Sequence, residues 1–172
     1  MTESYQTILM DPPWPESGVG RIKRGADKHY PLLKPEKILE VIYCSGHFRP
    51  AVNAHLYCWV TNNYLEDGLW LVRALGFRYI TLITWVKDRM GLGQYFRGQT
   101  EQLIFAVKGR LPALTKDQST LLYSKRGGHS VKPENSYALI EAVSPGPRLE
   151  MFARSQRPGW DAWGNEVEGR LL

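Results

Sequence analysis

Apolar and polar positions group into short blocks along the chain, and these blocks predict strands that alternate with helices. Runs rich in apolar and β-branched residues predict strands at residues 7–10, 55–60, 79–87, 101–109, 121–123 and 148–154. The run at 79–87 is nearly continuous, so we expect that strand to be buried on both faces of a sheet. Strands alternating with helices favour an α/β fold with a mostly parallel sheet and helices on both faces.

Apolar residues at helical spacing predict three helices between those strands. We expect helices at residues 35–44, 63–75 and 132–146, with Pro35 and Pro133 in first turns and Gly76 as a stop signal. The segment 160–169 (WDAWGNEVEG) contains tryptophan and glycine and is predicted to pack on the sheet. No internal repeat or linker divides the sequence, so we predict a single domain over residues 1–172.

The first predicted strand runs into an unusual turn, Asp11-Pro12-Pro13-Trp14. Each proline lacks a backbone N–H and has a fixed φ angle, so neither a strand ladder nor a helix continues through the pair. A stiff turn at the carboxyl end of a strand presents the Asp11 carboxylate, bare carbonyl oxygens and the Trp14 indole at the edge where open α/β sheets bind ligands. A simple strand stop is the plainer interpretation of the same four residues.

The amino-acid composition limits the classes of protein to which the chain can belong. With 43% hydrophobic and 23% charged residues, the chain is typical of a soluble globular protein, and no apolar run is long enough to span a membrane. The first residues lack the order of a secretory signal, so we expect a cytoplasmic protein of a bacterium or of a phage-infected host. Two cysteines and four scattered histidines show no metal-ligand spacing, and no metal site is predicted.

The net charge of +5 suits a polyanionic partner. The positions of the basic residues in the sequence are more informative than the net value. Three basic, glycine-bearing stretches lie at residues 20–28, 87–98 and 124–132. Interleaved or neighbouring aromatic residues, Tyr30, Tyr95 and Phe96, suit a surface that holds phosphates and stacks bases. Three ordinary solvated loops have the same composition, and on charge alone that alternative is slightly favoured.

Several stretches together resemble one family of enzymes. The turn at 11–14 resembles the catalytic motif of amino-group methyltransferases that use S-adenosylmethionine. Five further stretches resemble the N6-adenine methyltransferases typified by the catalytic subunit of the mRNA adenosine methyltransferase complex: HYP at 29–31, TWVK at 84–87, HSVKP at 129–133, LIEAVSPGPRLEMFAR at 139–154 and WDAWGNE at 160–166. The likeness runs in order over nearly the whole chain. Because the catalytic strand comes first and the cofactor strand near the end, it implies a circularly permuted Rossmann-like sheet.

The resemblance implies catalytic roles for Asp11, Pro12, Pro13 and Trp14. An adenine amino nitrogen is a poor nucleophile because its lone pair is delocalised into the ring. If the Asp11 carboxylate and a carbonyl of the rigid turn accept its two N–H groups, the lone pair can localise on the nitrogen. Trp14 offers a flat face for the base, and Tyr30 is a candidate second face. The basic residues expected to contact the substrate are Arg21, Lys23, Arg24 and Lys87.

The resemblance also implies S-adenosylmethionine as the cofactor, lying across the carboxyl edge of the sheet beside Asp11. Lys132 is expected to meet its methionine end, with Ser130 as a weaker neighbour that could instead cap the following helix. The residues expected around the adenosine are Phe152, Arg154, Asn165 and Glu166. The sequence departs from the best-known member at Glu166, where that member has an amide. The loop after Arg154 is also shorter, which leaves Gln156 and Arg157 unassigned.

The expected substrate is an adenine in nucleic acid, with DNA preferred over RNA because the chain is small and shows no partner-binding extension. Two alternatives stay open: a catalytically inactive subunit that binds nucleic acid, and an N-methyltransferase that acts on a protein or a small amine. The retained Asp11 and Trp14 disfavour the first alternative. The likeness of the HYP, HSVKP and GNE stretches disfavours the second. The sequence leaves the oligomeric state open between a monomer and a homodimer.

Overall fold

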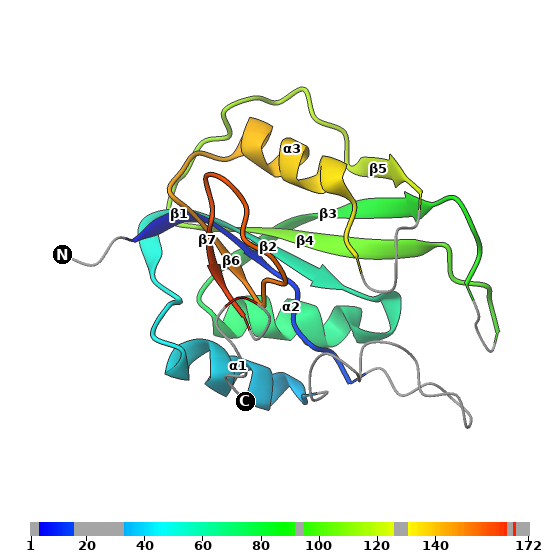
Figure 1. Ribbon diagram of the computed structural model, residues 1–172, viewed down its shortest axis with the longest axis horizontal. Coiled ribbons are helices and arrows are strands. Elements are labelled where there is room, and N and C mark those ends of the chain that lie inside the picture. The colour runs from blue at the N-terminus through cyan, green and yellow to red at the C-terminus, as the bar shows by residue number, and fades with distance from the viewer. Residues whose placement is uncertain (1–3, 16–32, 92–94, 126–130, 165–166, 168–172) are drawn as a thin grey trace.

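The computed structural model describes residues 4–15, 33–91, 95–125, 131–164 and 167. These residues form one seven-stranded sheet covered by helices on both faces (Figure 1). The strands are β1 (Tyr5–Met10), β2 (Pro50–Val60), β3 (Arg78–Lys87), β4 (Thr100–Lys108), β5 (Leu121–Ser124), β6 (Arg148–Met151) and β7 (Asp161–Trp163). The helices are α1 (Pro35–Cys44), the short 3₁₀ helix η2 (Asn62–Tyr64), α2 (Leu65–Ala74) and α3 (Glu134–Val143).

The strands are arranged in the order β5-β3-β4-β2-β1-β6-β7. Every neighbouring pair is parallel except the two pairs that contain β4, which runs antiparallel to β2 and β3. The expected mostly parallel sheet is therefore confirmed. The first strand of the chain, β1, lies beside β6 from near its end, as a permuted order requires. Because β4 is reversed, its first residues lie at the edge where β1, β2 and β3 end.

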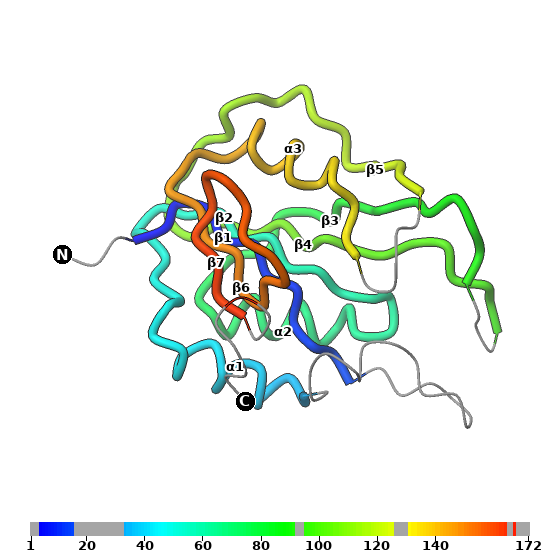
Figure 2. The backbone as a smooth tube through the Cα atoms, in the orientation of Figure 1, coloured from blue at the N-terminus to red at the C-terminus, as the bar shows by residue number. Residues whose placement is uncertain are grey.

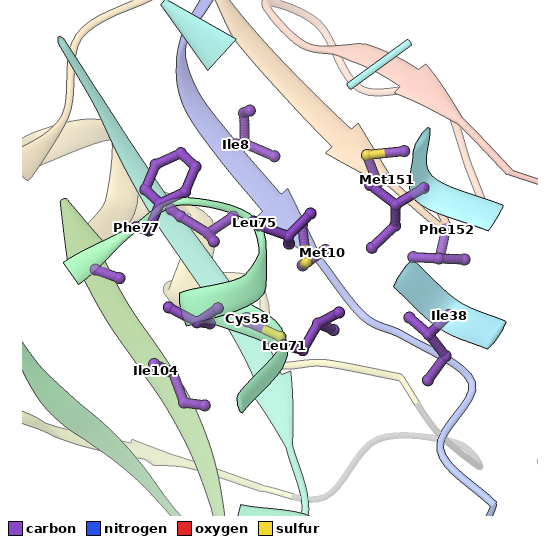
Figure 3. Packing of buried hydrophobic residues seen from close by; sticks show 14 of the residues in the cluster. Ile8, Met10, Ile38, Cys58, Leu71, Leu75, Phe77, Ile104, Met151 and Phe152 are labelled. Atoms are coloured by element: carbon purple, nitrogen blue, oxygen red, sulfur yellow. The ribbon is translucent and has the colours of Figure 1, made fainter. Parts of the chain in front are cut away.

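Residue alternation along the strands divides the core into two layers. On one face, Met10 of β1 and Cys58 of β2 pack against α1 and α2, with Ile38 and Leu71 supplied by the helices (Figure 3). On the other face, the cluster packs against α3 and contains Leu9, Tyr57, Trp59, Ile83, Trp85, Leu103, Leu122, Leu139, Ile140 and Trp160. Figure 1 shows α3 on the opposite side of the sheet from α1 and α2, so helices on both faces are also confirmed.

Three details differ from the sequence-based expectation. The first half of β3 is not buried on both faces, since Tyr79 is 36% and Ile80 is 40% exposed. The reason is that β5 pairs only with Thr84–Lys87, so the beginning of β3 is an open edge. Residues 161–163 do not pack on the sheet but join it as β7. The strand expected at 148–154 ends at Met151, because Phe152 adopts a left-handed conformation with φ +62°.

A buried polar network lies in the middle of β2, around His55 and Tyr57. His55 is 1% exposed, and its Nε2 lies 2.9 Å from the carbonyl oxygen of Leu111, so this nitrogen must donate. Its Nδ1 then accepts from the Ser144 hydroxyl at 2.7 Å, and the Tyr57 hydroxyl lies 2.8 Å from the same Ser144 oxygen. Burial lowers the pKa of His55, and its hydrogen bond to Leu111 offsets only part of that effect. The network fixes the neutral form of the ring.

A lowered histidine pKa makes stability depend on pH in a definite direction. Below the ordinary value of 6.5, the unfolded chain binds a proton that folded His55 resists, so the stabilisation is present above 6.5 and is lost as pH falls. We expect the free energy of unfolding to lose up to about 1.4 kcal/mol from this group at one pH unit below 6.5. Urea unfolding on both sides of this range should show a weaker pH dependence for His55→Gln than for the wild type. Equal slopes in the two proteins would contradict the assignment.

Candidate active site

The turn after β1 is held by backbone hydrogen bonds in which the prolines supply the acceptors and other residues supply the donors. The N–H of Trp14 donates to the Pro12 carbonyl at 2.9 Å, and the N–H of Leu33 donates to the Pro13 carbonyl at 3.0 Å. Each carbonyl oxygen has a second lone pair and so retains capacity for a further donor. Asp11 stands directly after β1 with a side chain that is 21% exposed. The turn therefore places one carboxylate and two prolyl carbonyls close together in fixed positions.

Trp14 does not have the position that the sequence suggested. The residue is only 5% exposed, and its indole N–H donates to the carbonyl of Trp59 at 2.9 Å. Its ring stacks on Tyr64 with centroids 6.2 Å apart and planes 12° apart. In this structure Trp14 therefore offers no open face to a base, and its role toward a substrate stays a prediction. Trp14 instead anchors the turn to the core beneath it, which fixes the orientation of Asp11.

Four charged side chains form a continuous chain beside the turn. The Lys132 ammonium group lies 3.1 Å from Asp11 Oδ1 and also contacts Glu101 Oε1. The other carboxylate oxygen of Glu101 accepts from Lys87 Nζ at 2.8 Å. Lys132 also lies 5.4 Å from the ring centroid of Trp59, and Lys87 lies 4.6 Å from that of Trp85. Two partly buried cations thus alternate with two carboxylates at this edge of the sheet.

Strand geometry explains why these groups meet. Side chains two residues apart lie on the same face of a strand, so Asp11 follows Leu9 onto the face covered by α3. By the same rule, Lys87 follows Trp85, and Glu101 precedes Leu103 on the reversed strand β4. Lys132 enters from the other direction, two residues before α3 begins at Glu134. The network is therefore a property of one face at one sheet edge.

The two carboxylates have opposite pKa shifts. Burial raises the pKa of Asp11, and the nearby charge of Glu101 raises it further, while Lys132 and, more weakly, Arg154 act against this. Burial alone would also raise the pKa of Glu101, but Lys132 and Lys87 outweigh it and hold the pKa below the usual range. Asp11 and Glu101 together raise the pKa of Lys132 despite its burial. Glu101 is thus the firmly ionised member of the network, and Asp11 is the more responsive one.

Glu101 is the site residue that the sequence analysis missed. It is 6% exposed, and it holds both lysines of the network. From the sequence it appears as one polar residue at the start of an apolar strand. Its place at the site depends on the reversed direction of β4, which the apolar pattern does not reveal. The signal available in the sequence was an acidic residue directly before a run of apolar residues.

The two lysines predicted as site residues both lie at this edge. Lys132, predicted to meet the cofactor, has a side chain that is 15% exposed and reaches Asp11. Lys87, predicted to contact substrate, is 20% exposed and is held by Glu101. The structure thus brings both predicted lysines into contact with the same carboxylate, while their roles toward a ligand stay predictions.

The end of β6 forms the other side of the candidate site. Phe152 is 4% exposed, and its ring packs edge-on against Trp163 with centroids 5.5 Å apart, in the layer under α1 (Figure 3). In the described structure the residue therefore supplies packing and a left-handed backbone turn, and its expected place beside an adenosine stays a prediction. Arg154 is partly buried and close enough to Asp11 to lower its pKa.

The loop after Arg154 is fixed to α3. Arg157 forms a bidentate pair with Glu134, with distances of 2.5 and 2.6 Å, and its guanidinium lies 3.7 Å from the ring centroid of Tyr137. Gln156 donates to the carbonyl of Trp160 at 3.3 Å. These contacts give both side chains structural partners, which agrees with leaving them unassigned to the cofactor.

Several predicted site residues lie outside the residues that the structure describes. They are Arg21, Lys23, Arg24, Tyr30, Ser130, Asn165 and Glu166. Their roles stay predictions. Within the described part of the chain, no group of three or more His, Cys, Asp or Glu side chains is arranged to hold a metal ion. The described helices also include none with the length and apolar character needed to cross a bilayer.

Comparisons with known proteins agree with this arrangement. The family model described as MT-A70 matches residues 5–166. The type II methyltransferase M.MunI of a Mycoplasma species is 29% identical over 96% of this chain and 78% of the relative. The N6-methyladenosine RNA methyltransferase MTA1 of Cryphonectria parasitica is 27% identical over 95% of this chain and 52% of the relative. Human METTL3, an N(6)-adenosine-methyltransferase catalytic subunit, is 29% identical over 66% of this chain and 22% of the relative.

The charge network predicts how the pKa of Asp11 responds to substitution. Glu101→Gln should lower this pKa, because it removes a neighbouring negative charge and leaves Lys132 to Asp11 alone. Lys132→Gln should raise it, because the main opposing cation is lost. Carboxyl chemical shifts followed through a pH titration measure both changes. The control Glu134→Gln alters an exposed carboxylate paired with Arg157 and should leave Asp11 unchanged. Shifts of the same sign in the two network variants would contradict the assignment.

The close backbone packing around Gly164 predicts a second measurable effect, on the free energy of unfolding. A Cβ atom added there would lie 2.3 Å from the carbonyl oxygen and 2.6 Å from the nitrogen of Ala153, both backbone atoms that cannot yield cheaply. We expect Gly164→Ala to lower the free energy of unfolding by about 2–3 kcal/mol, as overpacking does in a tight interior. Gly98→Ala is a matched control, because an added Cβ meets nothing within 4 Å there. Chemical denaturation of both variants tests this, and equal stabilities would refute the close approach.

Proposed function

Since the chain belongs to the MT-A70 family, we propose that it transfers a methyl group from S-adenosylmethionine to the N6 amino group of adenine in nucleic acid, with DNA preferred over RNA. The observation that carries this proposal is the Asp11 carboxylate, fixed at the carboxyl end of β1 beside two prolyl carbonyls and held by Lys132. The family match covers nearly the whole chain, and the relatives named above are methyltransferases.

The described residues fit a zwitterionic, cationic cofactor. The Asp11 carboxylate and the Lys132 ammonium offer charges of both signs within 3.1 Å of each other, and Arg154 lies near them. Within the described residues, the indole N–H of Trp59 and the hydroxyl of Thr61 are buried without a hydrogen-bond partner, and both lie where β2 ends at this edge. Such unpaired donors favour a polar ligand in place of apolar packing. We assign Lys132 and Arg154 to the cofactor, together with Ser130, Asn165 and Glu166 from outside the described residues.

The acceptors of the turn supply what an adenine amino group needs. When bound, S-adenosylmethionine supplies an electrophilic methyl group on a positively charged sulfur atom. Asp11 would accept one amino N–H and a prolyl carbonyl the other, which would leave the nitrogen lone pair free to attack the methyl carbon, with the C–S bonding pair returning to sulfur. The surplus proton of the methylated amino group passes to Asp11 or to water. Pro12 and Pro13 hold the acceptors in place beforehand, which lowers the entropic cost of alignment.

Lys132 favours the ionised form of Asp11, which this role requires. An ionised carboxylate accepts hydrogen bonds only, whereas a protonated one also donates. Burial raises the pKa of Asp11, and Lys132 opposes that effect. Activity should therefore be present above the pKa of Asp11 and be lost as pH falls through it. The loss should begin at a higher pH than for an ordinary aspartate.

The preference for DNA rests on the relative M.MunI. The likeness to this type II methyltransferase extends over most of both chains, whereas the chain spans about half of MTA1 and about a fifth of METTL3. The match therefore covers a larger share of the type II methyltransferase than of MTA1 or METTL3. An adenine in a duplex must also leave the base stack before its amino group reaches Asp11.

Transfer of labelled methyl groups to single-stranded DNA, duplex DNA, RNA and protein tests the proposal. We expect incorporation into adenine N6 of DNA, and a loss of at least about 100-fold in kcat for Asp11→Asn, because one charged acceptor is removed. Cofactor binding measured by calorimetry and the thermal unfolding curve should show that Asp11→Asn stays folded. Glu134→Gln, an exposed carboxylate on α3, serves as the control and should keep wild-type kcat.

Each other outcome selects a different function. Incorporation mainly into RNA would overturn the DNA preference but keep the chemistry. Incorporation into protein alone would favour the amine methyltransferase alternative. Cofactor or nucleic-acid binding without any transfer would favour the inactive binding subunit, and unchanged turnover in Asp11→Asn would remove the role of that carboxylate.

A further inference from the structure

The connection between β3 and β4 carries a group of side chains with no packing role in the described fold. Tyr95 is 92%, Phe96 is 89% and Met90 is 68% exposed, and Arg89 and Arg97 stand beside them, also exposed. We call the connection between Lys87 and Gln99 the arm, and we call these five residues the arm surface. Figure 2 shows the described residues of this connection projecting beyond the rest of the sheet. Two adjacent, almost fully exposed aromatic rings are unusual in a soluble protein and indicate a contact surface.

The base of the arm is firmly built and tied to the candidate active site. The Lys87 N–H donates to the Gln99 carbonyl at 2.9 Å, and the Gln99 side chain donates back to the Lys87 carbonyl at 2.9 Å. Further out, the Gly91 N–H donates to the Gly98 carbonyl at 2.6 Å. The Lys87 ammonium group then joins Glu101, which leads through Lys132 to Asp11. The arm therefore has a fixed direction relative to the catalytic carboxylate.

The chemistry of the arm surface selects a polyanionic partner with flat apolar faces. Arg89 is 85% exposed, and its neighbour Asp88 is the one acidic residue between Lys87 and Gln99 in the sequence. Positive charge next to exposed aromatic rings matches nucleic acid, in which phosphates alternate with stackable bases. A second copy of this chain meeting the same surface would bring arginines against arginines, which opposes self-association through it.

Chain geometry limits how far the arm can reach. Phe96 is five residues from Glu101 in the sequence, a span of at most about 17 Å for extended chain. One strand of DNA rises about 3.4 Å per nucleotide. The two rings can therefore contact nucleotides no more than about five positions away from the nucleotide that lies beside Glu101. The arm surface is therefore placed to contact nucleotides that flank the target adenine, while the adenine occupies the site beside Asp11.

We propose that the arm surface binds the nucleic acid next to the target adenine, with Tyr95 and Phe96 stacking on flanking bases and Arg89 and Arg97 contacting phosphates. This inference rests on the proposed function. When the target base leaves the stack, its neighbours lose a stacking partner, and an aromatic side chain can take that place. The arm thereby contributes affinity and a preference for particular flanking nucleotides without touching the reacting atoms.

The decisive comparison replaces flat rings by apolar side chains that cannot stack. Fluorescence anisotropy with a duplex and a single-stranded oligonucleotide measures affinity for wild type, for Tyr95→Leu/Phe96→Leu, and for Tyr95→Trp/Phe96→Trp. We expect the leucine variant to bind about 10- to 100-fold more weakly, because each base stacked on an aromatic ring adds substantially to affinity. The tryptophan variant should bind at least as well as wild type. Val52→Ala, an 82% exposed apolar residue of β2, is the control and should change nothing.

The salt dependence of nucleic-acid affinity and the assembly state of the protein distinguish the remaining outcomes. Arg89→Gln/Arg97→Gln should reduce the slope of log affinity against log salt by about 1.8, the value for two phosphate contacts on duplex DNA. Sedimentation velocity should give the same assembly state for wild type and the leucine variant. A leucine variant with wild-type affinity would overturn the inference, as would loss of self-association in that variant. Methylation by the wild type would still support the proposed function in either case, whereas a wild type that methylates no nucleic acid would overturn both.

Discussion

The interaction on which the site depends is the Lys132 ammonium group placed between two carboxylates. A buried cation is costly to remove from water, and a single partner seldom repays that cost. Here Lys132 contacts both Asp11 and Glu101, and Lys87 contributes a second cation to Glu101, so two positive and two negative groups balance across the sheet edge. Because the network is neutral as a whole, Asp11 can stay charged in a partly buried position without making the fold unstable.

The network exists because one strand runs against the others. In a fully parallel sheet the first residues of β4 would lie at the opposite edge, and Glu101 would be far from Asp11. The reversal of β4 brings Glu101 to the carboxyl ends of β1, β2 and β3, and it also makes the β3–β4 connection a hairpin at that edge. The same reversal therefore explains the carboxylate that orders the lysines and the arm that projects beside the site.

The sequence predicted the features that local chemistry determines. The two prolines after Asp11 define a rigid turn from their covalent structure alone, and the helix at 35–44 follows from apolar spacing and Pro35. Two other features required knowledge of distant partners. Trp14 is buried because Tyr64 and the Trp59 carbonyl receive it, and Glu101 reaches the site through β4 pairing. The direction of a strand and the partner of a ring are non-local properties that periodicity does not record.

The burial of Trp14 changes which aromatic surfaces are open to bases. A ring that stacks on Tyr64 and donates its N–H inward holds Asp11 in place, and it cannot at the same time serve as an open platform. Among the described residues around this edge, the broad aromatic faces left to solvent are those of Tyr95 and Phe96 on the arm and of Tyr123 at 66% exposure on β5. Tyr123 pairs with Val86 of β3, directly before Lys87, so it too stands at the base of the arm. The aromatic faces open to solvent at this edge therefore lie away from the turn after β1, on the β5–β3–β4 side of the sheet, where the exposed arginines of the arm surface also lie.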